Sequence, residues 1–483
     1  MKKLTIFLNL CFSVFLFSSF EEYFYPKTLR IDFYHTGDAK EETISLDKFY
    51  LIDHWAGPLK NLIDPTDLGK YRVEIYNLEK EKLIFALNFD SIFAEYQTTR
   101  KAIVGKKKTF SETVLIPMPK KDFKIEIKKR EKRHQYLTIF EENIILKDIF
   151  ILKEKPKGKY FIWEKDTCGK PSNCVDIVIL AEGYTRKEKR KALSHFEKFY
   201  EIFFTQEPYK NLKNKFNFYG IFVPSSESGC DEPSFGIWKE TPFGTSFDSL
   251  DSERYILSEE NKNIRNWASL VPYDAILIMI NHSRYGGGGI YNLYATFTAE
   301  NQWKDYLMLH EFGHSFGGLG DEYYTSSTSY EDFYKIDEEP AEPNITALLE
   351  GQPLKWAKFV SKDTPIPTPW EKEEFDRRDM EYQKEREKLY RELTHAKIDK
   401  NIERVKEIEE KINNLSRDNF YKLEKFFSES KWKGVVGAYE GAGYRDKGLY
   451  RPEIDCIMFS RGKKPYCKVC REAIIERIKF LTE

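Results

Sequence analysis

The chain has 483 residues, of which 77 are Lys or Arg and 78 are Asp or Glu, so its net charge is −1 with histidine neutral. This balance offers no field that would attract nucleic acid, and we expect no nucleic-acid partner. A hydrophobic share of 41% and an aromatic share of 16% exclude a disordered or collagen-like chain. The length suggests roughly three domain-sized units.

Residues 1–20 are predicted to form a signal peptide. Two lysines precede an apolar stretch from Leu4 to about Phe17, and two serines follow it. The alternative is a transmembrane anchor, but the stretch is shorter than the ~20 apolar residues that a spanning helix needs. We therefore expect export to the periplasm, the cell surface or the medium, with no stable membrane insertion after cleavage.

Six of the seven cysteines lie outside this segment, and an even number in an exported chain fits disulfides. Cys168 and Cys174 bracket a short loop, which makes a local bridge plausible. Cys467 and Cys470 could instead be half of a zinc knuckle, but a knuckle needs four ligands and only Cys456 is nearby. No other pairing follows from the sequence.

Residues 26–150 read as short strands separated by turn residues, which predicts an N-terminal β-sandwich-like domain with an accessory role. The clearest strands are expected at 29–34, 71–76, 82–89, 113–116 and 123–127.

Residues 158–483 change to α/β organisation and are the predicted catalytic domain. Helical patterns occur at 185–204 and 301–316, and the continuous apolar runs are of the buried-strand type. These runs lie at 175–181, 216–223 and 275–280, and 290–297 is expected to be one more strand.

Residues 370–428 are predicted to be a helical hairpin inserted into this domain. Charges are dense, glycine and proline are absent from 371–428, and apolar residues recur every three or four positions from Ile398 to Leu415. A break near 394–401 separates the two helices. A solvated arm with one apolar seam is the favoured interpretation, and a docking arm for a partner is the alternative.

The predicted chemistry centres on His310-Glu311-Phe312-Gly313-His314. On a helix both imidazoles lie on one face and can reach one ion, while Glu311 is offset by about 100° and can act on a water bound to that ion. Three glycines then allow a sharp turn that brings Asp321 and Glu322 back beneath the histidines. Since a catalytic zinc takes three protein ligands and a water, Asp321 is the predicted third ligand. Glu322 is the alternative ligand, or a partner to an imidazole N–H.

The segment HEFGHSFGGLGDEY resembles the IgA-peptidase family of zinc metallopeptidases, which is metzincin-like but has an Asp where metzincins usually have a third His. The resemblance implies a zinc metallopeptidase fold preceded by the β module that the family carries, with Zn²⁺ as cofactor. Further similar segments lie at 175–185, 228–231, 243–255, 437–444, 450–452 and 456–458.

The resemblance also implies two roles that the residues alone do not reveal. Met458 would be the methionine of a Met-turn beneath the zinc ligands. The run 290–297 would be the edge strand of the catalytic sheet, to which a peptide substrate adds antiparallel. The residues expected to offer this edge are Ile290, Tyr291, Asn292, Leu293 and Tyr294.

The sequence thus predicts a secreted zinc-dependent endopeptidase that acts on a polypeptide. Glu311 would be the general base and then the general acid. Tyr444 and Tyr450 are candidates to stabilise the oxyanion because they lie near the Met-turn in the sequence. One alternative is an exported binding or adhesion protein with a structural or vestigial zinc site, which would not need Glu311. A second alternative is a hydrolase that cleaves a peptidoglycan cross-link or an ester. Nothing in the residues predicts recognition of immunoglobulin.

Overall fold

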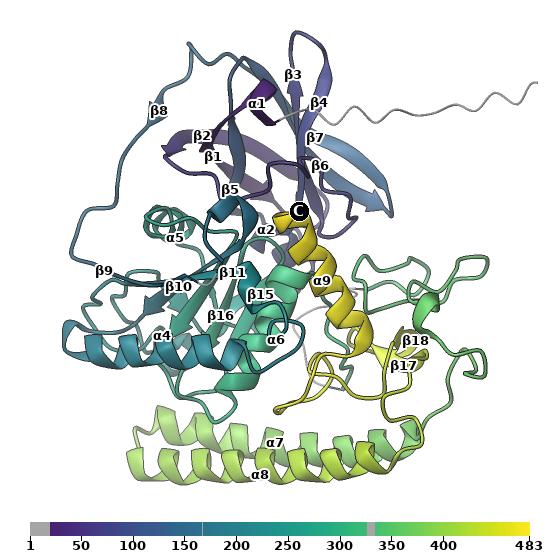
Figure 1. The fold of residues 1–483 in the computed structure, drawn as a ribbon. Coiled ribbons are helices and arrows are strands. Elements are labelled where there is room, and N and C mark those ends of the chain that lie inside the picture. The colour runs from purple at the N-terminus through teal and green to yellow at the C-terminus, as the bar shows by residue number, and fades with distance from the viewer. Residues whose placement is uncertain (1–19, 167, 326–333) are drawn as a thin grey trace, which may run out of the picture.

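The computed structural model describes residues 20–166, 168–325 and 334–483 (Figure 1). The predicted signal peptide, apart from Phe20 at its end, lies outside these residues. Within the described part of the chain, no helix combines the length and the apolar character that crossing a membrane requires.

The N-terminal part, which follows the short helix α1 (Phe20–Tyr23), contains two four-stranded sheets, as the strand pattern predicts (Figure 1). Inward-facing side chains such as Leu29 and Ile31 of one sheet and Val73 and Ile75 of the other share one apolar cluster. The first sheet has the order β5 (Lys108–Pro119), β1 (Phe24–Gly37), β2 (Glu42–Ile52), β8 (Ile151–Leu152). The second has the order β4 (Lys82–Phe89), β3 (Tyr71–Asn77), β6 (Phe123–Lys132), β7 (Gln135–Ile144). The short helices α2 (Ile92–Gln97) and α3 (Arg100–Ile103) connect β4 to β5.

A six-stranded sheet forms the centre of the remaining chain. Its order is β15 (Gly287–Ile290), β16 (Tyr294–Thr298), β14 (Ala275–Ile280), β10 (Val175–Glu182), β11 (Phe216–Phe222), β9 (Phe161–Asp166). The four inner strands are parallel, and the two edge strands run antiparallel to their neighbours. The three continuous apolar runs of the sequence are neighbours in the middle of this sheet, where both faces are covered.

The two faces of this sheet pack against different parts of the molecule. On β10, Ile177 and Ile179 belong to the cluster with the helices α4 (Lys189–Phe203) and α6 (Lys304–Gly317). Val178 and Leu180 belong to the cluster that also contains the N-terminal sandwich and α5 (Asn261–Ala268). The sandwich and the central sheet therefore share one apolar core.

The predicted strand at 290–297 is only partly correct, because Ile290 ends β15 and residues 294–297 belong to β16. Residues 291–293 form a three-residue turn between β15 and β16, with Ile290 paired to Tyr294 and Asn292 at a φ of 56° in the left-handed region. Asparagine tolerates that region, so the run of β-prone residues is broken at its centre. The edge strand is β15, which was not predicted as a strand, and Tyr294 lies on the inner strand β16.

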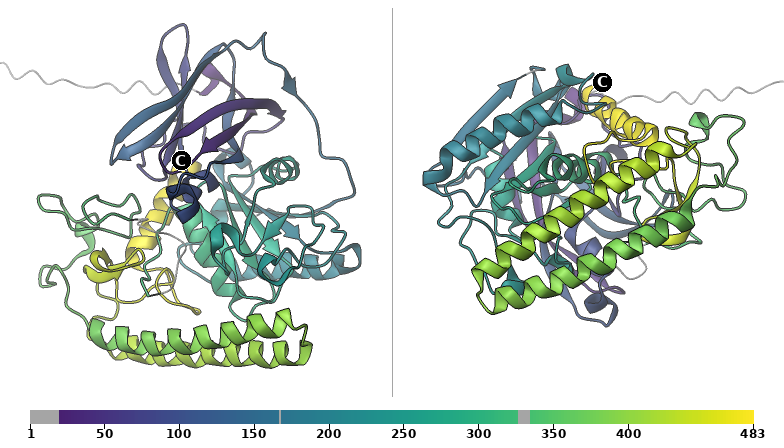
Figure 2. Two further views of the ribbon diagram at one scale, coloured as in Figure 1. Left: turned by 180° about the vertical axis from the view of Figure 1, so that it is seen from behind. Right: turned by 90° about the horizontal axis from the view of Figure 1, so that it is seen from below.

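The charged insertion forms two long helices side by side, α7 (Lys372–Ile398) and α8 (Ile402–Glu429), as Figures 1 and 2 show. Leu393, Ala396 and Ile408 fill the seam between them, which confirms the predicted hairpin. The remaining elements are the hairpin of β12 (Thr245–Ser246) and β13 (Leu257–Ser258), then β17 (Tyr439–Ala442), β18 (Arg445–Arg451) and α9 (Lys468–Thr482).

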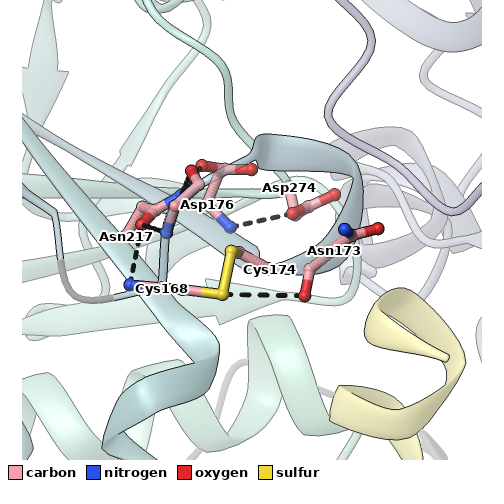
Figure 3. The surroundings of a disulfide bond; sticks show 7 residues. Cys168, Asn173, Cys174, Asp176, Asn217 and Asp274 are labelled. Atoms are coloured by element: carbon pink, nitrogen blue, oxygen red, sulfur yellow. Dashed lines mark hydrogen bonds between the residues drawn. A yellow bond between two sulfur atoms is a disulfide. The ribbon is translucent and has the colours of Figure 1, made fainter.

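Cys168 and Cys174 form a disulfide with an S–S distance of 1.99 Å, which confirms the predicted local bridge (Figure 3). The bridge closes the loop that leads into β10, and the Asn217 side chain accepts a hydrogen bond from the Cys168 N–H at 3.2 Å. The other cysteines of the described residues, Cys230, Cys456, Cys467 and Cys470, are buried free thiols. The even number of cysteines outside the signal peptide therefore does not correspond to further disulfides among the described residues.

Candidate active site

Helix α6 carries the motif and packs directly on the edge strand. A Cβ at Gly289 would lie 2.3 Å from the main-chain oxygen of Glu311 and 2.9 Å from Cβ of His314, so only glycine allows this approach. The helix ends at Gly318, whose φ of 60° is the left-handed conformation that glycine favours. The chain then turns back, and Asp321 returns to the histidines.

Three ligand atoms converge there. Asp321 Oδ1 lies 3.1 Å from His310 Nε2 and 3.2 Å from His314 Nε2. The two Nε2 atoms are 3.2 Å apart. Ligands about 2.1 Å from a tetrahedral zinc would be separated by about 3.4 Å, so the three positions fit one ion. His310, His314 and Asp321 are thus a group that could hold a metal.

The protonation of the histidines supports this fit. His310 Nδ1 faces the carbonyl oxygen of Ile457 at 3.0 Å, and His314 Nδ1 faces that of Leu319 at 2.6 Å. A carbonyl only accepts, so each Nδ1 carries the proton and a neutral ring has its lone pair on Nε2. Two lone pairs and a buried carboxylate oxygen without a hydrogen-bond partner then face one another. A cation removes this repulsion.

Without a cation, protonation must relieve the repulsion. Burial lowers the pKa of His314, but Asp321, Glu311 and the Leu319 carbonyl together outweigh burial and raise that pKa to about 9. Burial likewise acts to raise the pKa of Asp321, yet the two histidines hold it well below the usual range. The site therefore favours positive charge at the point where the three side chains meet.

Glu311 lies next to the histidines on α6, with its side chain against β15. A Cβ at Gly287 would come within 2.9 Å of Glu311 Oε1. Burial raises the pKa of Glu311, the two histidines lower it, and Asp321 raises it further, with a net upward shift. A buried carboxylate with a raised pKa is suited to taking up a proton.

Tyrosines surround the cluster. The Tyr444 hydroxyl donates to Asp321 Oδ2 at 2.6 Å, and the Tyr306 hydroxyl lies 3.2 Å from His310 Nδ1. Tyr323 stacks near His310 and lines the same cavity. Tyr306 and Tyr323 were not predicted to be site residues. Tyr306 lies one helical turn before His310, and this spacing is the signal that could have identified it.

Two other predicted residues lie away from the ligand cluster. Tyr450 is not among the described residues that line the cavity, and its main chain pairs with Thr346 and with Glu440 of β17. Glu322 is fully buried, but its carboxylate accepts from the Asn344 side chain at 2.9 Å and lies 3.2 Å from Cys470 Sγ. The alternative in which Glu322 joins or supports the histidines is therefore wrong for this structure.

Met458 lies under α6. Its sulfur would be 3.0 Å from a Cβ at Gly313, between the two histidines, and its carbonyl accepts from the Glu322 N–H at 2.9 Å. The preceding residue, Ile457, holds the His310 ring. The turn at Ile457 and Met458 thus contacts both α6 and the chain that returns after it at Glu322.

The cluster opens into a cavity of about 220 Å³. One wall is β15, through Gly287 and Gly289, and another is the segment of Ser252, Arg254 and Tyr255. The helical hairpin supplies a further wall, through Asp379, Tyr382, Gln383, Arg386, Ser416, Asn419, Phe420 and Leu423. The insertion is thus part of the site, which neither a solvated arm nor a docking arm predicts.

Two family models match the chain. The one described as IgA Peptidase M64 matches residues 164–478, and the one described as Peptidase M64 N-terminus matches residues 19–141. The first begins in β9 and ends within α9, so it contains the motif helix, Asp321 and the helical hairpin. Among curated proteins, none matches the sequence.

Proposed function

Because the chain belongs to the IgA peptidase M64 family, it is a peptidase, and we propose that it is a zinc-dependent endopeptidase whose metal is held by His310, His314 and Asp321. We assign this activity to residues 158–483. The observation that carries the proposal is the convergence of two imidazole Nε2 atoms and one carboxylate oxygen beside Glu311 in a cavity.

A zinc ion held there would supply an activated water and polarise the carbonyl of the scissile bond. Glu311 would accept the proton of that water on its carboxylate and then pass it to the leaving amine. Its raised pKa favours the uptake, and its place one residue after His310 keeps it within reach of the bound water.

The hydrogen bond from Tyr444 gives that residue a positioning role, because it fixes the carboxylate of Asp321 with Oδ1 towards the histidines. An oxyanion-stabilising role requires the Tyr444 hydroxyl to leave Asp321. Met458 supports the floor of the site as the methionine of a Met-turn.

We propose a polypeptide substrate that adds to β15 rather than to the run first expected. Gly287 is already bonded on its outer edge, since it accepts from Ile256 N–H at 3.1 Å and donates to the Arg254 carbonyl at 3.2 Å. Gly289 also lines the cavity and lies beside the motif helix, so we place the substrate main chain against it. Main-chain pairing of this kind tolerates many side chains.

We also propose that the protein is exported. The disulfide between Cys168 and Cys174 suits an oxidising compartment, and the N-terminal sequence has the pattern of a signal peptide.

The test is Glu311→Gln, which keeps the shape of the side chain and removes the base. We expect the variant to retain the zinc content of the wild type and to lose about 100-fold or more of kcat on unfolded casein. An unbiased cleavage-site profile of the wild type would identify the bonds that are cut.

Glu410→Gln on the exposed side of α8 is the matched control and should cleave as the wild type does. Casein cleavage at the wild-type rate by Glu311→Gln would refute the mechanism. Retention of zinc with no cleavage of any protein by the wild type would instead favour a binding protein with a vestigial site.

A further inference from the structure

A second group of metal-binding side chains lies beside the proposed active site. Cys456 follows β18, Cys467 and Cys470 lie at the start of α9, and Glu322 comes from the chain that returns after α6. All four side chains are buried, with at most 3% of their surface exposed. Their ligand atoms all lie within 4.8 Å of one another.

We propose that Cys456, Cys467, Cys470 and Glu322 bind a structural zinc ion that is distinct from the catalytic one. The sequence left the cysteines one ligand short of a zinc knuckle. The structure supplies the missing ligand from a residue more than a hundred positions away, which is why no local pattern revealed it.

The spacing of the ligand atoms suits tetrahedral zinc. With Zn–S of about 2.3 Å, two sulfurs on one ion are about 3.8 Å apart, and a sulfur and a carboxylate oxygen about 3.6 Å apart. Cys456 Sγ and Cys470 Sγ are 3.9 Å apart. Glu322 Oε1 lies 3.2 Å from Cys470 Sγ and 4.0 Å from Cys467 Sγ.

Two of the three sulfurs accept hydrogen bonds from main-chain N–H groups, which suits an anionic, metal-binding sulfur. Main-chain N–H groups of Met458 and Cys467 donate to Cys456 Sγ at 3.5 and 3.2 Å, and that of Cys470 donates to Cys467 Sγ at 3.4 Å. Cys467 is also the N-cap of α9, a helix of 15 residues, where the helix dipole favours negative charge.

The carboxylate points to the same conclusion. Glu322 Oε2 is buried and has no hydrogen-bond partner, although Asn344 orients the other oxygen. A buried carboxylate oxygen without a partner is costly, and a bound cation removes that cost. The buried Arg451 interacts electrostatically with Glu322 and offsets part of the negative charge that these four ligands would leave on a divalent ion.

The position of this group gives the ion a role in the active site. Glu322 is bonded through its main chain to Asp321 and donates its N–H to the carbonyl of Met458. Cys456 is two residues before Met458. A metal held by these side chains would lock the returning chain to the turn beneath the histidines, and so fix the third catalytic ligand.

A disulfide is the competing arrangement of the same thiols. It needs an S–S distance of about 2.05 Å, and three thiols cannot all pair with one another. The structure has formed the bridge at Cys168 and Cys174 but leaves these three sulfurs unbonded. The close approach of these three unbonded sulfurs therefore favours a bound metal, and the test must exclude a disulfide between any two of them.

The experiment separates the two sites by mutation and uses zinc itself as the probe. In the otherwise intact mature protein, His310→Ala/His314→Ala removes two ligands of the catalytic cluster and leaves the thiols. After loading with Zn²⁺ and dialysis, we expect this variant to retain about one zinc per chain, with X-ray absorption showing Zn–S distances of about 2.3 Å. With Co²⁺ in place of Zn²⁺, the same variant should show thiolate-to-cobalt charge-transfer absorption.

Cys467→Ser/Cys470→Ser should lose this sulfur-bound ion, whereas Cys230→Ser, at another buried thiol, should keep it. If the double cysteine variant does not fold, titration of the histidine variant with a thiol-specific mercurial takes its place and must release the retained zinc. The proposal is overturned if the histidine variant binds no zinc, if its zinc has only nitrogen and oxygen ligands, or if peptide mapping finds Cys456 joined to Cys470. None of these readouts requires peptidase activity, so they stand apart from the test of Glu311.

Discussion

Replacement of Gly289 by alanine tests how closely the motif helix α6 must approach the edge strand. The added methyl carbon would lie 2.3 Å from the main-chain oxygen of Glu311 and 2.9 Å from Cβ of His314. Non-bonded atoms settle near 3.5 Å, so the strand and the helix must separate by about 1 Å. We expect a loss of about 1–3 kcal/mol in the free energy of unfolding, the range for overpacking a close-packed region. A misplacement of about 1 Å in the site lowers kcat/KM by about 100-fold.

The assay compares kcat/KM on unfolded casein, zinc content and denaturant unfolding. Gly351→Ala is the matched control, because its φ of 76° makes alanine cost roughly 1–2 kcal/mol while no atom lies within 4 Å of the new methyl group. It should lose stability but keep its activity. If Gly289→Ala has the same kcat/KM as this control, the close approach of helix and strand is not what sets the geometry of the site.

Three further predictions concern other contacts. Tyr444→Phe removes the 2.6 Å hydrogen bond to Asp321 and should lower zinc affinity or kcat/KM by about 10–100-fold. Zinc titration and casein cleavage measure these two quantities. Unchanged values would show that Asp321 needs no support from Tyr444. Burial acts to raise the pKa of Glu42, but hydrogen bonds to a buried histidine and to a lysine lower that pKa to about 2. The charge of Glu42 should therefore stabilise the fold by about 3 kcal/mol at neutral pH. This contribution is present above the usual pKa of a glutamate and is lost as the pH falls towards 2. The difference in stability between wild type and Glu42→Gln, measured by denaturant unfolding, should therefore shrink from pH 6 to pH 3. A difference that stays constant over this range contradicts the prediction. Cys168→Ala/Cys174→Ala opens a short loop and should lower the free energy of unfolding by about 2 kcal/mol, and chemical denaturation with no change would show that the bridge is dispensable.

The parts of the site that follow from local geometry could be predicted from the sequence. His310 and His314 are four residues apart on one helix, and a helix fixes their relation whatever surrounds it. The apolar runs in the centre of the sheet were equally clear, because strands that are buried on both faces need continuous hydrophobic sequence.

The parts that depend on distant contacts could not be predicted. Asp321 and Glu322 are adjacent carboxylates, and only the folded path of the chain decides that one meets the histidines and the other the thiols. Gly287 and Gly289 carry no strand signal in the sequence, because the residues that need their missing side chains, Glu311 and His314, are more than twenty positions away. The walls formed by the hairpin helices likewise depend on where the insertion folds back.

The core that joins the N-terminal sandwich to the central sheet has a consequence for how the chain is made. That core takes residues from Phe20 to Tyr294, so it cannot close until about three-fifths of the chain has been synthesised. Domains that fold independently do so in turn during synthesis. Here part of the apolar surface of the first 150 residues stays uncovered until strands that are made later join it. A nascent chain of this protein therefore exposes that surface to solvent over that interval, and a peptidase stripped of its sandwich would expose the face of the central sheet that the sandwich covers.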